Sequence, residues 1–264
     1  MQVLQRLAGL LPMKQEFYVE HEGILLHMKL DLPDERKEYY PLLLLIHGFT
    51  GHMEERHLLG VRDTAVEEGY ACLRAELYGH GESGGSFADH DLNKWLAEVV
   101  FIIDQLKAVS WIDKLILSGH SQGGLLCVLA AGKRPEALDA LMPLSPAVNI
   151  PDFARSGNFL GNHFDPDDPP EVMGVWDDGI LKSNYFFVAK DIYPEEYIPL
   201  YHGPVLIVHG NADETIDVAV GRRTADLYEN CTFVEVNDDT HCFDRHLENC
   251  LLAVRSFLKE QTTK

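Results

Sequence analysis

Residues 115–124, LILSGHSQGG, predict a buried strand and a sharp turn, and the apolar residues after them predict a helix. The turn contains the pattern G-x-S-x-G, with Ser121 at its centre. In a nucleophile elbow this serine stands at the tip of a strained strand-to-helix turn, where glycines let the two elements cross closely. The start of the helix would favour an anion forming at Ser121. Because so short a pattern also arises by chance, the rest of the chain must supply a base and an acid.

The rest of the chain alternates between strand and helix patterns. Strands are expected at 15–20, 24–30, 41–46, 70–76, 140–145, 204–209 and 232–236, and helices at 54–68, 92–108, 218–229 and 247–259. The run 41–46 is apolar almost throughout, which is typical of a central parallel strand buried on both faces. The pattern predicts an α/β fold: a mainly parallel sheet with helices on both faces, whose first two strands form an antiparallel hairpin.

The connection 147–203 is far longer than the few residues that most connections need. It is rich in Pro and Asp, and its aromatic content argues against disorder. These aromatics are Trp176, Tyr185, Phe186, Phe187, Tyr193 and Tyr197. We therefore predict a core made of residues 1–146 and 204–264, with 147–203 inserted as a cap over Ser121.

A serine hydroxyl becomes a nucleophile when a histidine takes its proton and a carboxylate holds that histidine. His241 follows the last predicted strand, and Asp213 lies in a turn after the strand before it, so both are expected at the same sheet edge as Ser121. His246 is the alternative base and Asp217 the alternative acid. The sequence thus predicts a triad of Ser121, Asp213 and His241.

An ester hydrolysed at such a serine also needs donors for the oxyanion that forms. The loop after the strand 41–46 is expected to supply the backbone N–H of Phe49, and the residue after the nucleophile supplies that of Gln122. A simple strand-ending turn remains the alternative for residues 47–48. No H-E-x-x-H, clustered Cys/His set or P-loop stands out, so we expect no metal and no cofactor.

The composition limits which classes of binding partner and which cellular locations are expected. The chain has 42 acidic and 22 basic residues and a formal net charge of -20, which argues against nucleic acids and anionic membranes. Five cysteines without a C-x-x-C pair fit a reducing compartment, and residues 1–14 lack the features of a signal peptide. We expect a cytoplasmic protein that acts on a small-molecule ester. The sequence leaves the oligomeric state open, with a homodimer as one option.

Taken together, these motifs resemble the α/β-hydrolase family over nearly the full length. The matching segments are 119–123 (GHSQG), 47–49 (HGF), 209–213 (HGNAD) and the late His241. More narrowly, the chain is similar to bacterial cinnamoyl (feruloyl) esterases through 48–51 (GFTG), 144–147 (LSPA), the elbow with Gln122 and the segment 162–170. The resemblance implies hydrolysis of hydroxycinnamate esters through an acyl-serine, and an aromatic-lined pocket formed by the cap.

Polar side chains that meet the phenolic hydroxyl in that family are expected at Asp152 and Tyr185. Their alternative role is ordinary packing and solvation of the cap. Two positions depart from the family pattern, since Glu76 replaces an aspartate and Leu160 replaces a polar residue. Two other functions stay open. One is a short-chain acylglycerol lipase or general carboxylesterase, which Leu160 would suit, and the other is a non-catalytic binding protein with the same fold.

Overall fold

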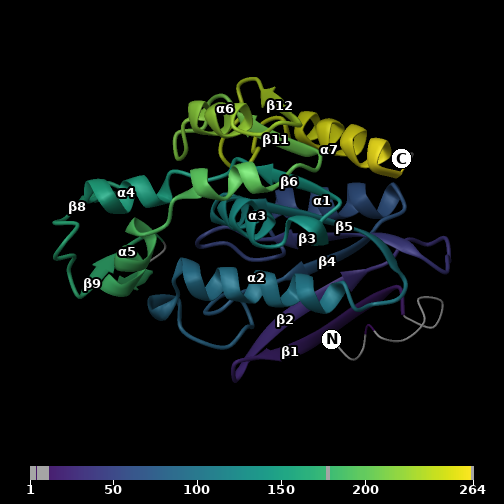
Figure 1. Cartoon of the computed structure of the whole chain (residues 1–264), viewed down its shortest axis with the longest axis horizontal. Coiled ribbons are helices and arrows are strands. Elements are labelled where there is room, and N and C mark those ends of the chain that lie inside the picture. Colours follow the sequence, from purple (N-terminus) through teal and green to yellow (C-terminus); the bar gives the residue numbers. More distant parts are fainter. Residues whose placement is uncertain (1–3, 5–11, 177–178, 263–264) are drawn as a thin grey trace.

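An eight-stranded sheet forms the centre of the protein, which we describe from a computed structural model (Figure 1). The structure describes residue 4, residues 12–176 and residues 179–262. The strand order is β1-β2-β4-β3-β5-β6-β11-β12. The strands are β1 Lys14–His21, β2 Ile24–Asp31, β3 Tyr40–Ile46, β4 Ala71–Ala75, β5 Ile112–His120, β6 Ala140–Leu144, β11 Val205–Gly210 and β12 Cys231–Val236.

The sheet is antiparallel only at its first edge. β1 pairs with β2 and β2 with β4 in antiparallel fashion, whereas β4, β3, β5, β6, β11 and β12 pair in parallel. Glu22 and Gly23 both have positive φ, as the two-residue turn of a tight hairpin requires. The predicted hairpin and mainly parallel sheet are confirmed. The carboxyl ends of the parallel strands meet at one edge, where ligands bind in such sheets.

Alternate side chains of β3 enter two separate cores. Leu42, Leu44 and Ile46 pack in the layer that contains α2 (Leu92–Leu106), α3 (Gln122–Lys133) and α6 (Val218–Asp226). Leu43 and Leu45 pack in the opposite layer, with α1 (Arg56–Glu67) and α7 (Leu247–Thr262). Burial on both faces is the reason for the unbroken apolar run in this strand.

The chain between β6 and β11 forms short elements, of which α4, α5, β8 and β9 gather at the left of Figure 1. They are α4 (Ile150–Ser156), β7 (Asn158–Phe159), β8 (Asn162–His163), β9 (Val172–Gly174), β10 (Ile180–Lys182), α5 (Ser183–Lys190), η5 (Pro194–Glu196) and η6 (Ile198–Leu200). α5 contacts α4 and also α2 of the core. Two further 3-10 turns, η3 (Phe87–Asp89) and η4 (Pro135–Ala137), lie in core loops.

Two predictions concern the chain's surroundings. Within the described ranges, no helix has both the length and the apolar character of a membrane span. The stretch in which we expect no signal peptide lies mostly outside the described residues, since 1–3 and 5–11 are not among them.

Candidate active site

Ser121 lies in a sharp turn between β5 and α3. Its φ of 56° and ψ of -118° form a sparsely populated conformation that costs a residue with a side chain about 1–3 kcal/mol. The turn is tight, because a Cβ on Gly123 would lie 2.4 Å from the His47 carbonyl oxygen. A Cβ on Gly119 would lie 2.6 Å from the backbone of Gly123. The two glycines of the motif therefore let the chain present Ser121 at the start of α3.

Two buried histidines hold the loop that follows β3. His47 Nδ1 donates to the Gly48 carbonyl (2.8 Å), and its Nε2 accepts from the Leu77 N–H (3.1 Å). Burial keeps the pKa of His47 well below its ordinary value, so the ring is neutral and can accept this bond. His80 Nε2 hydrogen-bonds the Phe49 carbonyl oxygen. The bonds of His47 and His80 therefore fix the peptide groups of this loop in position.

Phe49 lies in the loop after β3 and lines the same cavity as Ser121, and Gln122 is the first residue of α3. The first N–H groups of a helix have no acceptor within the helix, so the Gln122 N–H is available to a ligand. The side chain of Gln122 is buried, and its Oε1 accepts a 2.6 Å hydrogen bond from the Tyr185 hydroxyl. The assignment of these two backbone groups as oxyanion donors stays a prediction.

Asp213 lies in the turn after β11, and its fully buried carboxylate accepts four hydrogen bonds. Oδ2 accepts from His241 Nδ1 (2.6 Å) and His209 Nε2 (3.0 Å), and Oδ1 accepts from the N–H groups of Thr215 (2.8 Å) and Ile216 (2.9 Å). Burial alone would raise the pKa of Asp213, but the bonds from His209 and His241 outweigh it and hold the pKa well below its usual range. The carboxylate is therefore ionised and can hold the imidazole in one orientation.

His241 is also fixed through its backbone. Its carbonyl accepts a 2.8 Å bond from His120 Nε2, and the His120 ring lies between those of His57 and His241, with centroids 4.2 and 4.6 Å away. Burial lowers the pKa of His57 to about 4, so this ring is uncharged at neutral pH and packs against His120 as an uncharged aromatic ring. The buried Asp239 carboxylate gathers the N–H groups of Thr240, Arg245 and His246. The histidine loop is thus held on three sides.

A cavity of about 400 Å³ opens at Ser121 and His241. It is lined by Gly48, Phe49, Thr50, Gly51, Glu55, His120, Ser121, Trp176, Ala212, Glu214, Thr215, Thr240, His241, Cys242, Asp244 and Arg245. Ser121 and His241 share this cavity without a hydrogen bond between them. In hydrolases this contact often tightens only when substrate is bound.

The two alternative residues have other partners. His246 is about 40% exposed and lies 3.8 Å from Glu248. Asp217 caps α6 by accepting the Ala219 N–H at 2.8 Å. Neither one is hydrogen-bonded to Asp213 or His241. The structure therefore groups Ser121, Asp213 and His241, as the sequence predicts, and their catalytic role stays a prediction.

The structure separates the two residues expected to bind a phenolic hydroxyl. Tyr185 is fully buried, and its ring lies 5.8 Å from that of Phe49 and 5.5 Å from that of Phe159. Asp152 is exposed, pairs with Arg155 (2.7 Å) and lines a different groove between α4 and α6. Asp152 is therefore not among the residues at Ser121, whereas Tyr185 meets the site through its bond to Gln122 and its ring contact with Phe49.

Some site residues were not identified from the sequence. Glu55 and His120 line the cavity and His209 bonds Asp213, yet the sequence patterns that contain these residues gave none of them a role at the site. His209 alone had a usable signal, because it is the last side chain of an apolar strand and stands four residues before Asp213.

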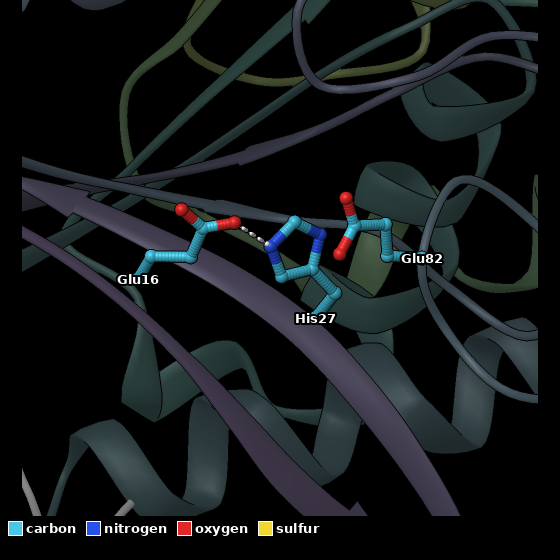
Figure 2. Close-up of side chains that lie close together, drawn as sticks. All are labelled: Glu16, His27 and Glu82. Carbon is cyan, nitrogen blue, oxygen red and sulfur yellow. Dashed lines mark hydrogen bonds and ion pairs between the residues drawn. The ribbon is translucent and has the colours of Figure 1, made fainter.

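A second cluster of ionisable side chains lies away from Ser121, at the antiparallel edge (Figure 2). His27 is buried, and Nε2 and Nδ1 are 2.7 and 2.8 Å from carboxylate oxygens of Glu16 and Glu76. Glu82 approaches the same ring, accepts from Tyr18 and donates its N–H to Glu76 (2.8 Å). Both nitrogens of the His27 ring already have partners. The cluster ties β1 and β2 to Glu76 and to the loop 77–85, so Glu76 has a structural role at this position.

Comparison with known proteins adds to this geometry. The structure of Est1E from Butyrivibrio proteoclasticus with ferulic acid bound is 44% identical, covers 94% of this chain and 100% of its own, and has a TM-score of 0.92. The chain belongs to the α/β-hydrolase family of serine esterases. The expected resemblance to bacterial feruloyl esterases is confirmed. The family described as Hydrolase_4, Serine aminopeptidase, S33, matches residues 38–164.

More distant members extend the comparison. The human palmitoyl-protein thioesterase ABHD10, mitochondrial, is 27% identical over 213 residues, which are 74% of this chain and 66% of that protein. The chain thus spans slightly less than two thirds of this α/β-hydrolase relative's length. Mouse alpha/beta hydrolase domain-containing protein 10 has a TM-score of 0.74 at 18% identity and covers 93% of this chain and 99% of its own, which shows a shared fold.

Proposed function

We propose that this α/β-hydrolase cleaves hydroxycinnamate esters through an acyl-enzyme formed at Ser121. The observation that carries this proposal is the 44% identity, over 94% of the chain, to Est1E with ferulic acid bound. A phenolic acid bound to so similar a protein makes phenolic acyl groups the first choice for this one. The small-molecule ester expected from the sequence is then an ester of such an acid.

The side chains support a defined reaction. Ser121 Oγ attacks the ester carbonyl while His241 Nε2 takes its proton, and Asp213 keeps the proton of Nδ1 in place at 2.6 Å. The oxyanion is stabilised by the backbone N–H groups of Phe49 and Gln122. His241 then gives its proton to the alcohol oxygen, which leaves. Water repeats the sequence on the acyl-serine and releases the acid.

Aromatic packing supports an aromatic acyl group. The Phe49 ring contacts those of Phe87, Phe159 and Tyr185 with centroids 5.4 to 5.8 Å away. A planar cinnamoyl group that enters between such rings gains roughly 0.5–1.5 kcal/mol per contact beyond its buried area. Phe159 and Tyr185 come from the segment 147–203. We therefore assign this segment to the role of a cap that forms the acyl site, with a cytoplasmic location and a homodimer as further proposals.

A second candidate is a general carboxylesterase. Tyr185 donates its hydroxyl to Gln122, and Asp152 lies in another groove, so neither stands ready for a phenolic hydroxyl in this structure. Leu160 also offers an apolar surface in place of a polar partner. Short apolar acyl groups would suit these residues equally well.

The decisive experiment compares acyl groups. Methyl ferulate, methyl cinnamate, p-nitrophenyl butyrate, a monoacylglycerol and a palmitoyl thioester are offered to the same enzyme preparation, and kcat/KM is measured for each. The proposal predicts the highest kcat/KM with methyl ferulate among the unactivated esters. A higher value for the monoacylglycerol favours the general carboxylesterase, and a higher value for the thioester favours the chemistry named for ABHD10. Turnover of none of them supports a binding protein.

A further inference from the structure

His209 stands near the end of β11, at a position where the alternation of the strand predicts an apolar side chain. Val205 and Ile207 pack in the core layer that contains α6, and His209 is the next residue on that face. Its side chain is fully buried. Because a buried polar group without a partner is destabilising, a histidine here needs a hydrogen bond that offsets its burial.

That hydrogen bond goes to the carboxylate of Asp213. His209 Nε2 lies 3.0 Å from Asp213 Oδ2 and 3.0 Å from the carbonyl oxygen of Ile216. Both of these atoms are acceptors, so Nε2 carries a proton and shares it between them. Ile216 also donates its N–H to Asp213 Oδ1 at 2.9 Å. His209 therefore holds the turn 213–216 against the end of β11.

Asp213 Oδ2 thus accepts hydrogen bonds from two imidazoles. The second donor is His241, whose Nδ1 lies 2.6 Å away. Oδ1 accepts the N–H groups of Thr215 and Ile216, so the four bonds occupy both carboxylate oxygens. The carboxylate cannot rotate away from His241 without breaking its bond to His209. The orientation of His241 therefore depends on His209.

Helix α6 leaves space for the His209 ring at Gly221. A Cβ at this position would lie 2.4 Å from His209 Nδ1 and 3.2 Å from the Phe233 ring. Glycine inside a helix is less favourable than alanine, so a close approach is needed to explain it. His209 Nδ1 makes that approach, and it is buried without a hydrogen-bond partner among the described residues. The ring is therefore held between α6 and Asp213.

We propose that His209 is a positioning residue for the reaction at Ser121: it holds Asp213 in the orientation in which Asp213 binds His241, and Gly221 provides the space that this requires. The inference rests on the proposed acyl-serine reaction. His209 does not line the cavity at Ser121, so its effect on the reaction passes through Asp213.

This arrangement also has a consequence for the pH dependence of the reaction. Two N–H donors on one oxygen share its negative charge. Loss of the His209 donor leaves more of that charge for the His241 N–H, which favours the protonated imidazole. The base is then lost at a higher pH when the solution is acidified.

The first test compares two substitutions of His209. His209→Met fills a similar space without a donor, whereas His209→Gln keeps an amide N–H near the position of Nε2. The substrate is p-nitrophenyl butyrate, because its hydrolysis requires no phenolic acyl group. We expect kcat to fall roughly 10- to 100-fold in His209→Met and less than about threefold in His209→Gln, with KM within about threefold in both. The acid limb of the kcat profile should move up by roughly half a pH unit in His209→Met.

The second test leaves His209 itself unchanged. Gly221→Ala favours the helix but places a methyl group against the ring, so kcat should fall roughly three- to tenfold. Added to His209→Met, it should lower kcat by less than about a further twofold, because a methionine side chain can move aside. His202→Met is the control, since His202 pairs with Glu229 (3.0 Å) at an exposed site and should leave kcat at the wild-type value.

Wild-type kcat in His209→Met would overturn the inference. Equal losses in His209→Met and His209→Gln, or an acid limb that stays at its wild-type pH, would also overturn it, because packing alone would then explain the loss. If circular dichroism shows that His209→Met is unfolded, Gly221→Ala decides, and wild-type kcat in that variant contradicts the inference.

The proposed function fails in other ways. Hydrolysis of p-nitrophenyl butyrate without hydrolysis of methyl ferulate would refute the hydroxycinnamate specificity and leave the role of His209 intact. Near-normal turnover by Ser121→Ala would place the reaction elsewhere, and both proposals would then fail.

Discussion

The loops at the carboxyl edge of the sheet and the segment 147–203 both lie near Ser121, yet they are held in different ways. The loops are fixed by directional bonds between buried groups, as in the four hydrogen bonds to Asp213 and the three N–H groups on Asp239. The segment is held by ring packing, such as that between Phe159 and Phe186 at 5.5 Å, by short two-stranded pairs, and by polar bonds such as those from Arg155 to the carbonyl groups of Lys190 and Ile192.

This difference has a functional consequence. Hydrogen bonds specify positions to a fraction of an ångström, which proton transfer requires. Ring packing tolerates changes of shape and can adapt to different acyl groups. We infer that the loops determine whether the reaction occurs, whereas the segment determines which ester reacts. Substitutions in the loops should therefore lower activity on all esters together.

The largest effect is expected at the elbow. Ser121→Ala should abolish hydrolysis of every ester while the fold remains, because no other group can form the acyl-enzyme. In the subtilisin example, loss of the nucleophile costs on the order of a millionfold in turnover. Turnover of methyl ferulate and circular dichroism on the purified variant provide the measurement. Near-normal rates would exclude this site.

The second largest effect is expected at the acid of the triad, Asp213. Asp213→Asn keeps the shape of the side chain but removes the charge that holds the His241 Nδ1–H, and by the serine-protease example kcat should fall about 10⁴-fold. Asp217→Asn is the matched control, since Asp217 caps α6 and should leave kcat within about twofold. Equal losses in the two variants would contradict the assignment of the acid.

The same logic separates the two candidate bases. His241→Ala should lose nearly all activity, on the order of that lost with Ser121→Ala, whereas His246→Ala should retain most of it. Activity should also fall at acid pH, because a protonated imidazole cannot accept the serine proton. Initial rates of both variants provide the measurement. Full activity in His241→Ala with loss in His246→Ala would reverse the assignment.

Smaller effects are expected where the segment meets the elbow. Tyr185→Phe removes the donor to Gln122 Oε1, so kcat for methyl ferulate should fall by roughly three- to tenfold. Asp152→Ala should change it by less than about twofold, because Asp152 lies in a separate exposed groove. The ratio of methyl ferulate to methyl cinnamate shows whether either side chain meets the phenolic hydroxyl. A selective loss of ferulate activity in Asp152→Ala would contradict this ranking.

The smallest effect concerns stability. Glu98 is buried in α2 and accepts the Tyr78 N–H at 2.9 Å, and burial raises its pKa to about 7. Between the ordinary value of 4.5 and about 7 the folded chain keeps a proton that the unfolded chain releases, so stability falls as pH rises through this window.

Glu98→Gln removes that dependence. The variant should be more stable than the wild type by roughly 2 kcal/mol at pH 8 and nearly equal to it at pH 4. Urea unfolding at the two pH values provides the measurement. A variant that is less stable at pH 8 would show that Glu98 is not destabilised by burial.

Much of this architecture could be predicted from the sequence, because it rests on local patterns. The apolar run of β3, the G-x-S-x-G turn and the positions of Asp213 and His241 after strands each depend on neighbouring residues. The parallel sheet then brings the carboxyl ends of these strands to one edge, and no further sequence signal is needed for this.

The rest depends on contacts between distant parts of the chain. Asp152 and Tyr185 are 33 residues apart, and only the folding of 147–203 decides that one is exposed and the other lies against Gln122. The Oε2 atom of Glu55 likewise has no hydrogen-bond partner among the described residues, because it packs against Gly51. Tertiary packing of this kind leaves no periodic signal in a single sequence.

The central claim is that Ser121 carries the acyl group of a hydroxycinnamate ester. The most direct measurement is intact-protein and peptide mass spectrometry after rapid acid quenching of the enzyme with methyl ferulate. The account predicts a feruloyl adduct on the peptide that contains Ser121 in the wild-type protein, and no adduct in Ser121→Ala. An adduct on another residue, or hydrolysis of methyl ferulate that persists in Ser121→Ala, would contradict the account.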